Sequence, residues 1–84
     1  TQGFAKELGP SGIRVNALLP GITDTKFAAA LVQNEQFMAQ VVPQIPLRRA
    51  AQPDEMSGMI LYLASSASSY TTGASFVVDG GLLA

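Results

Sequence analysis

The sequence predicts an α/β fold, namely the C-terminal portion of a doubly wound parallel sheet that comprises its last two strands with flanking helices. Helix-like and strand-like segments alternate along the 84 residues, and strands that are separated by helices pair in parallel. The first predicted strand is apolar on both faces, which is typical of a strand buried in a parallel sheet. Two strands alone would leave both sheet edges open, so the pattern calls for further strands that these residues do not contain.

The composition supports a packed chain that hides part of its surface against more protein. Apolar residues make up 48% and charged residues only 13%, whereas a free small domain needs a charged surface for solubility. A net charge of −1 argues against a nucleic-acid partner. Because the chain has no Cys and no His, we expect no disulfide, no metal site and no histidine base. Chemistry must come from backbone groups, hydroxyls or carboxylates.

The N-terminal segment from Thr1 to Leu8 reads as the end of a helix with Phe4 facing inward. Gly9 is expected to take the left-handed cap, and Pro10 prevents the helix from continuing. A strand follows over Ile13–Leu19 and ends at Pro20-Gly21. Its first face alternates through Ile13, Val15, Ala17 and Leu19.

The segment Ile22–Val42 is predicted to be mostly helical, with Asp24 or Thr25 capping its start. Gln33-Asn34-Glu35 interrupts the helical spacing, so two short helices are possible. Residues Pro43 to Gln52, hereafter the connector, are expected to be irregular.

A helix is predicted from Pro53, because proline fits a first helical position and the acids after it suit the positive end of the helix dipole. Its expected core stripe consists of Met56, Met59, Ile60 and Leu63. Gly58 costs about 1 kcal/mol relative to alanine, which indicates close packing of another backbone. The serine run Ser65–Ser69 ends this helix, Ala74–Val78 forms the last strand, and Asp79-Gly80-Gly81 turns the chain.

The stretch from Met56 to Val78 is uncharged and long enough to span a bilayer. Several serines, two threonines and Gly73 interrupt it, so we expect no membrane association. The first residues lack the basic start and apolar run of a signal peptide. These features predict a cytoplasmic location.

The candidate binding site is the turn at residues 20–25, because ligands of open α/β sheets bind beyond the carboxyl ends of the strands. Gly21 permits close backbone approach. The amides of Ile22 and Thr23 open toward a helix start, which suits a phosphate or a carboxamide. Thr23 and Thr25 add hydroxyls. The same residues also fit an ordinary turn with a helix cap, and such dipeptides mark turns routinely.

The remaining polar residues have structural interpretations beside the functional ones. Asp79 suits a turn more than catalysis. Arg48 and Arg49 would suit a phosphate, yet two basic residues usually form a solvated face. Tyr62 and Tyr70 have no lysine four residues later to lower their pKa.

Six motifs follow one another in a specific order: Ala5-Lys6-Glu7-Leu8-Gly9, Gly12-Ile13-Arg14-Val15-Asn16-Ala17, Pro20-Gly21 with Thr25, Pro53-Asp54-Glu55, Leu61-Tyr62-Leu63-Ala64-Ser65, and Thr72-Gly73 leading to Val78-Asp79-Gly80-Gly81. Each is weak alone, but their order and spacing over nearly the whole chain resemble the C-terminal part of the short-chain dehydrogenase/reductase family. The resemblance implies a Rossmann-type sheet, an NAD or NADP cofactor, and reversible hydride transfer between an alcohol and a carbonyl substrate.

The resemblance also implies roles for particular residues. Pro20, Gly21, Ile22 and Thr23 would border the nicotinamide, and Thr25 would reach its carboxamide or the pyrophosphate. Residues 1–21 would supply the helix end, strand and Pro-Gly turn. Residues 22–52 would form a substrate lid, with Phe27 and Leu31 as lining. Residues 53–84 would form the last helix and strand and the subunit contacts of a homo-oligomer, a dimer or tetramer.

Three features of the family are absent from these residues: the Gly-rich phosphate loop, the Tyr-x-x-x-Lys pair and the catalytic serine. The function would therefore belong to a longer parent that includes the missing N-terminal part, and the 84 residues alone are expected to be inactive. One alternative is a stand-alone α/β self-association module that binds no cofactor. Another is an unrelated α/β fragment with a phosphate-binding turn.

Overall fold

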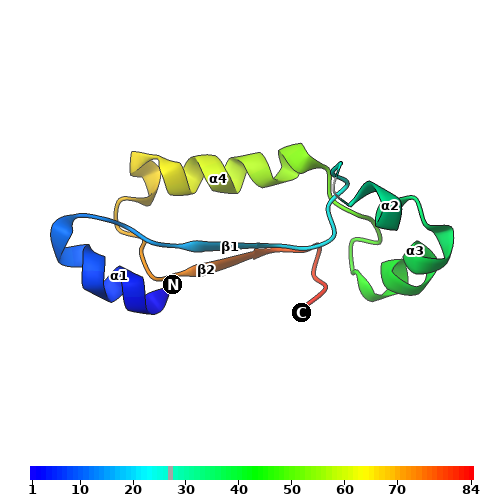
Figure 1. Cartoon of the computed structure of the whole chain (residues 1–84), viewed down its shortest axis with the longest axis horizontal. Coiled ribbons are helices and arrows are strands. Elements are labelled where there is room, and N and C mark those ends of the chain that lie inside the picture. Colours follow the sequence, from blue (N-terminus) through cyan, green and yellow to red (C-terminus); the bar gives the residue numbers. More distant parts are fainter. Residues whose placement is uncertain (27) are drawn as a thin grey trace. The chain divides into compact units, whose positions relative to one another are not determined.

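A computed structural model describes residues 1–26 and 28–84 (Figure 1). The helices are α1 (Gln2–Leu8), α2 (Ala29–Val32), α3 (Glu35–Val41) and α4 (Ser57–Ala64), and the strands are β1 (Ala17–Pro20) and β2 (Ser75–Val78). Short 3₁₀ turns cover Gly9–Ser11, Val42–Gln44, Pro53–Met56 and Ser66–Ser68. The two strands pair in parallel in one two-stranded sheet, which confirms the predicted α/β class.

The chain divides into two compact units. The first unit consists of Thr1–Leu19 and Ser57–Val77, and the second unit consists of Pro20–Met56 and Val78–Ala84. Each is therefore built from segments that lie far apart in the sequence. The first unit holds α1 and α4, and the second holds the turn at residues 20–25 and the connector.

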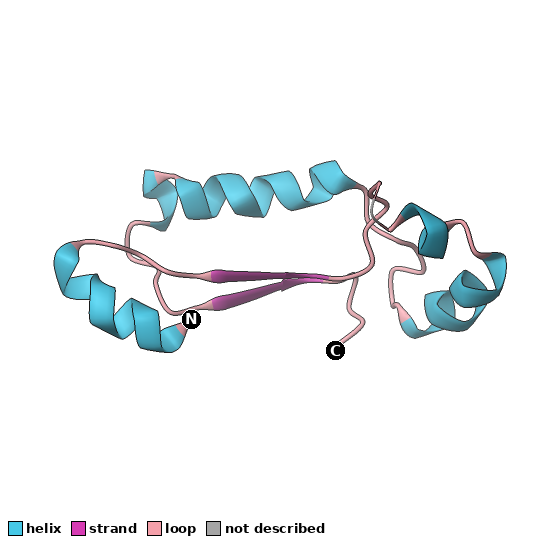
Figure 2. Ribbon diagram, viewed as in Figure 1, coloured by secondary structure: helices cyan, strands magenta, loops and turns pink. Residues whose placement is uncertain are grey.

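In the first unit, α4 and α1 lie on opposite sides of the paired strands (Figure 2). The Tyr62 ring of α4 meets the Phe76 ring of β2 edge to face, with 6.3 Å between their centroids. On α1, Ala5 is buried, and a Cβ placed on Gly73 would lie 3.3 Å from the Ala5 methyl group. Helices on both faces of the strands agree with the doubly wound arrangement.

A polar network centred on Arg14 joins the start of the first unit to the end of α4. Its Nη1 donates to Ser68 Oγ at 2.6 Å and to the Thr71 carbonyl at 3.4 Å. Its Nη2 donates to the carbonyls of Leu63 at 3.2 Å and Ser65 at 3.3 Å. Ser68 is completely buried. The guanidinium thus supplies donors and positive charge where the last helix carbonyls lack intrahelical partners.

Strand β1 begins at Ala17, not at Ile13 as the alternation predicts. The Asn16 side chain explains the difference, because its Nδ2 donates to the Thr71 carbonyl at 3.0 Å and its Oδ1 accepts from the Ala74 amide at 3.1 Å. A side chain therefore occupies backbone groups that a longer ladder would pair.

The helix cap at Gly9 was predicted wrongly. Gly9 has φ −55° and remains right-handed, and the left-handed residue is Gly12 with φ 78°. The reason lies in Pro10, whose fixed φ suits the first positions of a 3₁₀ turn and so extends the helical path beyond α1.

The stripe predicted on α4 is only partly buried. Met56, just before α4, is buried, whereas Ile60 is 54% exposed. No atom lies within 4 Å of a Cβ built on Gly58, so the close backbone predicted there is not among the described residues. Within the described part of the chain, helices are too short or too polar to cross a bilayer.

The second unit contains the two short helices that the sequence allowed. Asn34 separates α2 from α3, and its Oδ1 accepts from the Phe37 amide at 3.0 Å as an N-cap. Ile45 is 2% exposed and forms the core of this unit. A Cβ on Gly80 would lie 2.9 Å from Ile45 Cγ2, so Gly80 closes directly over that core.

The predicted turn at Asp79 is confirmed, and the carboxylate shapes it. Asp79 Oδ1 accepts from the Gly81 amide at 2.9 Å, and Oδ2 accepts from the Leu83 amide at 3.1 Å. Gly81 has φ 95°, and a Cβ there would lie 2.7 Å from Pro46 Cγ. The turn thus brings the last residues against the connector.

Candidate functional site

The turn at residues 20–25 leaves the carboxyl end of β1 inside the second unit. Its Gly21 amide donates to the Val78 carbonyl at 2.9 Å, so the turn starts where β2 also ends. This position beyond two parallel strand ends is where open α/β sheets bind ligands.

Gly21 is required by packing against the chain itself. A Cβ at this position would lie 2.7 Å from the Asp79 Cα and 2.8 Å from its Cβ. Such distances demand a backbone shift. Sequence reasoning assigned the glycine to the approach of a ligand and missed this contact, because nothing in the turn motif reveals which segment passes beside it.

A second unexpected contact joins the turn to the connector. Thr23 and Ala51 form a parallel β-bridge. The Ala51 amide donates to the Ile22 carbonyl at 2.8 Å, and the Asp24 amide donates to the Ala51 carbonyl at 2.8 Å. The connector was predicted to be irregular, and it carries no alternation that signals this pairing.

Three donors of the turn have no acceptor among the described residues. Among the described residues, the structure shows no hydrogen-bond partner for the amide N–H of Ile22 or of Thr23. Thr25 Oγ1 accepts from the Ala28 amide at 3.2 Å, which leaves its proton for another acceptor. The Thr23 hydroxyl donates its proton to the Gly21 carbonyl at 3.1 Å, so toward a ligand its oxygen can act only as an acceptor. These groups fit the hydrogen-bonding needs of a carboxamide or a phosphate.

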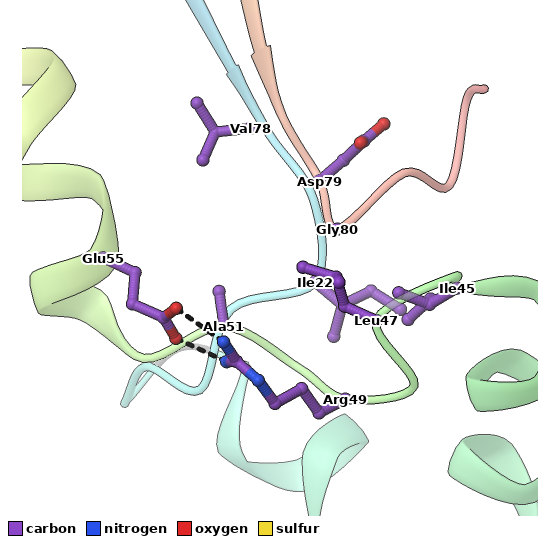
Figure 3. A pocket seen from close by; sticks show the side chains of 9 residues that line it. All are labelled: Ile22, Ile45, Leu47, Arg49, Ala51, Glu55, Val78, Asp79 and Gly80. Atoms are coloured by element: carbon purple, nitrogen blue, oxygen red, sulfur yellow. Dashed lines mark hydrogen bonds and ion pairs between the residues drawn. The ribbon is translucent and has the colours of Figure 1, made fainter.

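A pocket of about 120 Å³ lies beside the turn (Figure 3). Its lining consists of Ile22, Ile45, Leu47, Arg49, Ala51, Glu55, Val78, Asp79 and Gly80. Of the predicted site residues, only Ile22 lines it. Leu31 is 52% exposed on α2, and Phe27 lies outside the described residues.

Arg49 and Glu55 form a two-pronged ion pair at the wall of this pocket, as Figure 3 shows. Nη1 lies 2.5 Å from Oε1, and Nη2 lies 2.8 Å from Oε2. Oε1 also accepts from the Gln52 amide at 2.9 Å. Hydrogen bonds from Arg49, then from the Gln52 amide, lower the pKa of Glu55 to about 2. The hydrogen bond and charge of Glu55 raise the pKa of Arg49.

Other polar candidates serve the fold. The Tyr62 hydroxyl lies 2.9 Å from Thr71 Oγ1, and Asp79 uses both oxygens to cap its turn. Arg48 donates to the carbonyls of Pro43 and Ile45. The turn therefore presents hydrogen-bond donors without partners among the described residues, whereas these polar side chains are engaged elsewhere.

Comparison with known proteins finds enzymes that are similar to this chain. The family model described as enoyl-(acyl carrier protein) reductase matches residues 1–83. The chain is 48% identical over 84 residues to 3-alpha-(or 20-beta)-hydroxysteroid dehydrogenase of Mycobacterium tuberculosis, covering 100% of this chain and 30% of that protein.

Solved structures agree with the sequence match. A short-chain type dehydrogenase/reductase from Mycobacterium marinum is 45% identical with a TM-score of 0.89, covering 98% of this chain and 31% of the other. Gluconate 5-dehydrogenase from Burkholderia cenocepacia, in complex with NADP and tartrate, is 36% identical with a TM-score of 0.92, covering 99% and 32%. The chain thus spans about a third of the length of these relatives.

Proposed function

The chain belongs to the short-chain dehydrogenase/reductase family, and we propose that it forms the C-terminal part of an NAD- or NADP-dependent oxidoreductase. The reaction would be hydride transfer between the nicotinamide and an alcohol or carbonyl substrate. The match along residues 1–83 supports this proposal, as does the NADP bound to the related gluconate 5-dehydrogenase. The lack of cysteine fits a cytoplasmic protein.

The observation that carries the proposal is at the carboxyl ends of two parallel strands, where the Ile22 and Thr23 amides have no partner among the described residues and lie beside the Thr25 hydroxyl. These donors would hold the carboxamide of the nicotinamide, with Thr25 reaching the carboxamide or the pyrophosphate. Pro20 and Gly21 would direct the turn, and Gly21 does so by packing on Asp79. The cofactor supplies the hydride acceptor or donor when bound.

The other segments would complete the site. Residues 22–52 would cover the substrate, with Phe27 and Leu31 on the lining, and the acid–base residues would come from the missing N-terminal part. Residues 53–84 would form a contact surface between subunits of a dimer or tetramer. The exposure of Ile60 and Leu61 on α4 supports such a surface.

Replacing Thr25 tests the cofactor assignment in the full-length enzyme. Thr25→Ala removes about one hydrogen bond, roughly 0.5–1.5 kcal/mol, so the dissociation constant for NADH or NADPH should rise about 2- to 10-fold. Thr25→Ser keeps the hydroxyl and should bind like the parent, and Ser11→Ala is the surface control. Calorimetric titration measures all four proteins. Equal constants for Thr25→Ala and the parent would rule out this role.

A self-association module without cofactor is the second candidate, favoured by Leu61, which is 70% exposed. Light scattering on the 84 residues and on Leu61→Glu tests for association, and titration with NADH and NADPH tests for binding. A Tyr-x-x-x-Lys sequence encoded upstream of Thr1 supports the oxidoreductase. Turnover of ketones by the 84 residues alone would contradict the assignment of catalysis to the missing part.

A further inference from the structure

We propose that the Arg49–Glu55 ion pair is a positioning device that holds Ala51 against Thr23 and thereby aims the Thr23 N–H at the cofactor. The inference rests on the proposed function of the turn. Arg49 and Glu55 are positioning residues here, because neither supplies the donors at residues 22–25. All the residues involved belong to the second unit.

Hydrogen bonds on either side of Ala51 restrain the connector. The two parallel hydrogen bonds of 2.5 and 2.8 Å match the fixed fork of a guanidinium to a carboxylate, which restricts orientation as well as distance. The bond from the Gln52 amide to Glu55 Oε1, at 2.9 Å, adds a third tie. Ala51 lies between Arg49 and Gln52, so its backbone is fixed from both sides.

The restrained backbone of Ala51 in turn orients the peptide groups of the turn at residues 20–25. The Ala51 amide binds the Ile22 carbonyl, and the Ala51 carbonyl binds the Asp24 amide. In a trans peptide the C=O and the following N–H point in opposite directions, and cis peptides are absent from the described residues. Because the Ile22 carbonyl points toward Ala51, the Thr23 N–H must point away from the connector. Ala51 therefore determines where this donor is aimed.

The connector needs a further constraint between its buried anchor and Ala51. Upstream, the connector is anchored by buried Ile45 and by the Leu47 amide, which donates to the Gly80 carbonyl at 3.1 Å. Between that anchor and Ala51 lies Arg48, a left-handed residue with φ 58°, a conformation that costs about 1–2 kcal/mol in a residue other than glycine. The path after the anchor is thus unfavourable by itself, and the ion pair fixes its continuation.

Because the ion pair is exposed, global stability is a poor measure of its role, and local exchange and cofactor binding are better ones. The two side chains are 53% and 38% exposed, and surface ion pairs contribute little to global stability. A purely structural role therefore predicts small effects on unfolding and none on binding. A positioning role predicts local loosening of the turn together with weaker cofactor binding.

The test uses the full-length enzyme with Arg49→Gln, Glu55→Gln and the double variant. Hydrogen exchange at the Asp24 and Ala51 amides and the dissociation constant for NADPH or NADH are measured, with thermal unfolding to verify folding. We expect each single variant to speed both exchanges and to raise the constant about 2- to 5-fold, the range of an exposed pair. The double variant should be no worse than either single one, and Arg49→Lys, without the fork, should lie between.

Asp54→Asn is the matched control, since it removes a neighbouring exposed acid that forms no ion pair among the described residues. Unchanged exchange at Asp24 and Ala51 in both single variants overturns the proposal, and so does an equal effect of Asp54→Asn. Faster exchange with unchanged binding, while Thr25→Ala weakens binding, also overturns it. Faster exchange with unchanged binding in all variants, Thr25→Ala included, supports the positioning of the turn and overturns the function proposed for that turn.

Discussion

Each of the two units is stabilised internally by a different kind of contact. In the first unit, the Arg14 guanidinium binds carbonyl and hydroxyl oxygens of residues far along the chain. In the second unit, Gly21 and Gly81 let backbone and ring atoms approach closely, and the Arg49–Glu55 pair lies at the surface. Arg14 binds neutral acceptors in a partly buried place, whereas Arg49 binds a carboxylate at the surface. The contribution of an arginine to stability therefore depends on its binding partner and its burial, and not on residue type alone.

Arg14→Gln should produce the largest loss. The variant leaves carbonyls at the end of α4 and the buried Ser68 without their charged donor, and hydrogen bonds to charged groups contribute about 1.5–3 kcal/mol. We therefore expect the free energy of unfolding of the full-length protein to fall by about 3 kcal/mol. Urea unfolding measures it, and Arg14→Lys should recover only part. A loss as small as that of Arg49→Gln would erase the distinction between the two arginines.

Gly21→Ala should follow, because its methyl group would meet the backbone of Asp79. Overpacking of this kind costs about 1–3 kcal/mol.

Gly58→Ala is the opposite case, since nothing among the described residues lies within 4 Å of a Cβ built there. Alanine stabilises a helix by up to about 1 kcal/mol relative to glycine. Urea unfolding of both variants sharpens the comparison. A strong loss at Gly58 would indicate that a segment outside these residues packs there, as the sequence first indicated.

Acidification should have the smallest effect on stability, and this effect should arise in the second unit. The pKa of Glu55 is lowered from 4.5 to about 2, so its stabilising contribution is complete above pH 4.5 and is lost as the pH falls through about 2. Carbon-13 NMR titration of the Glu55 carboxyl should show the low pKa. In Arg49→Gln it should return toward 4.5. An unchanged low value in that variant would assign the shift to the Gln52 amide alone.

The sequence predicts the order of elements well, because that order depends on local periodicity and on glycine, proline and serine boundaries. The α/β class follows from it, and the interruption at Asn34 and the turn at Asp79 appear as expected. The start of β1 does not, because the Asn16 side chain replaces ladder bonds. The exposure of Ile60 was also missed, since helical spacing reports a face but not whether another segment covers it.

The candidate turn was found from its motif, yet its supports were not. The bridge between Thr23 and Ala51 and the contact of Gly21 with Asp79 join residues far apart in the sequence. Neither partner carries a local signal, since Ala51 is a small residue in an irregular stretch and Asp79 reads as an ordinary turn residue. The ion pair of Arg49 with Glu55 was likewise hidden, because two arginines in a row look like a solvated surface.

The contact between Gly21 and Asp79 has a consequence for how the protein is made. On the ribosome, the turn at residues 20–25 emerges well before Asp79, and domains made from distant segments must wait for their last contact. Until Asp79 has left the exit tunnel, the turn lacks its packing partner. A translation pause placed just before that point would prolong this incompletely packed state.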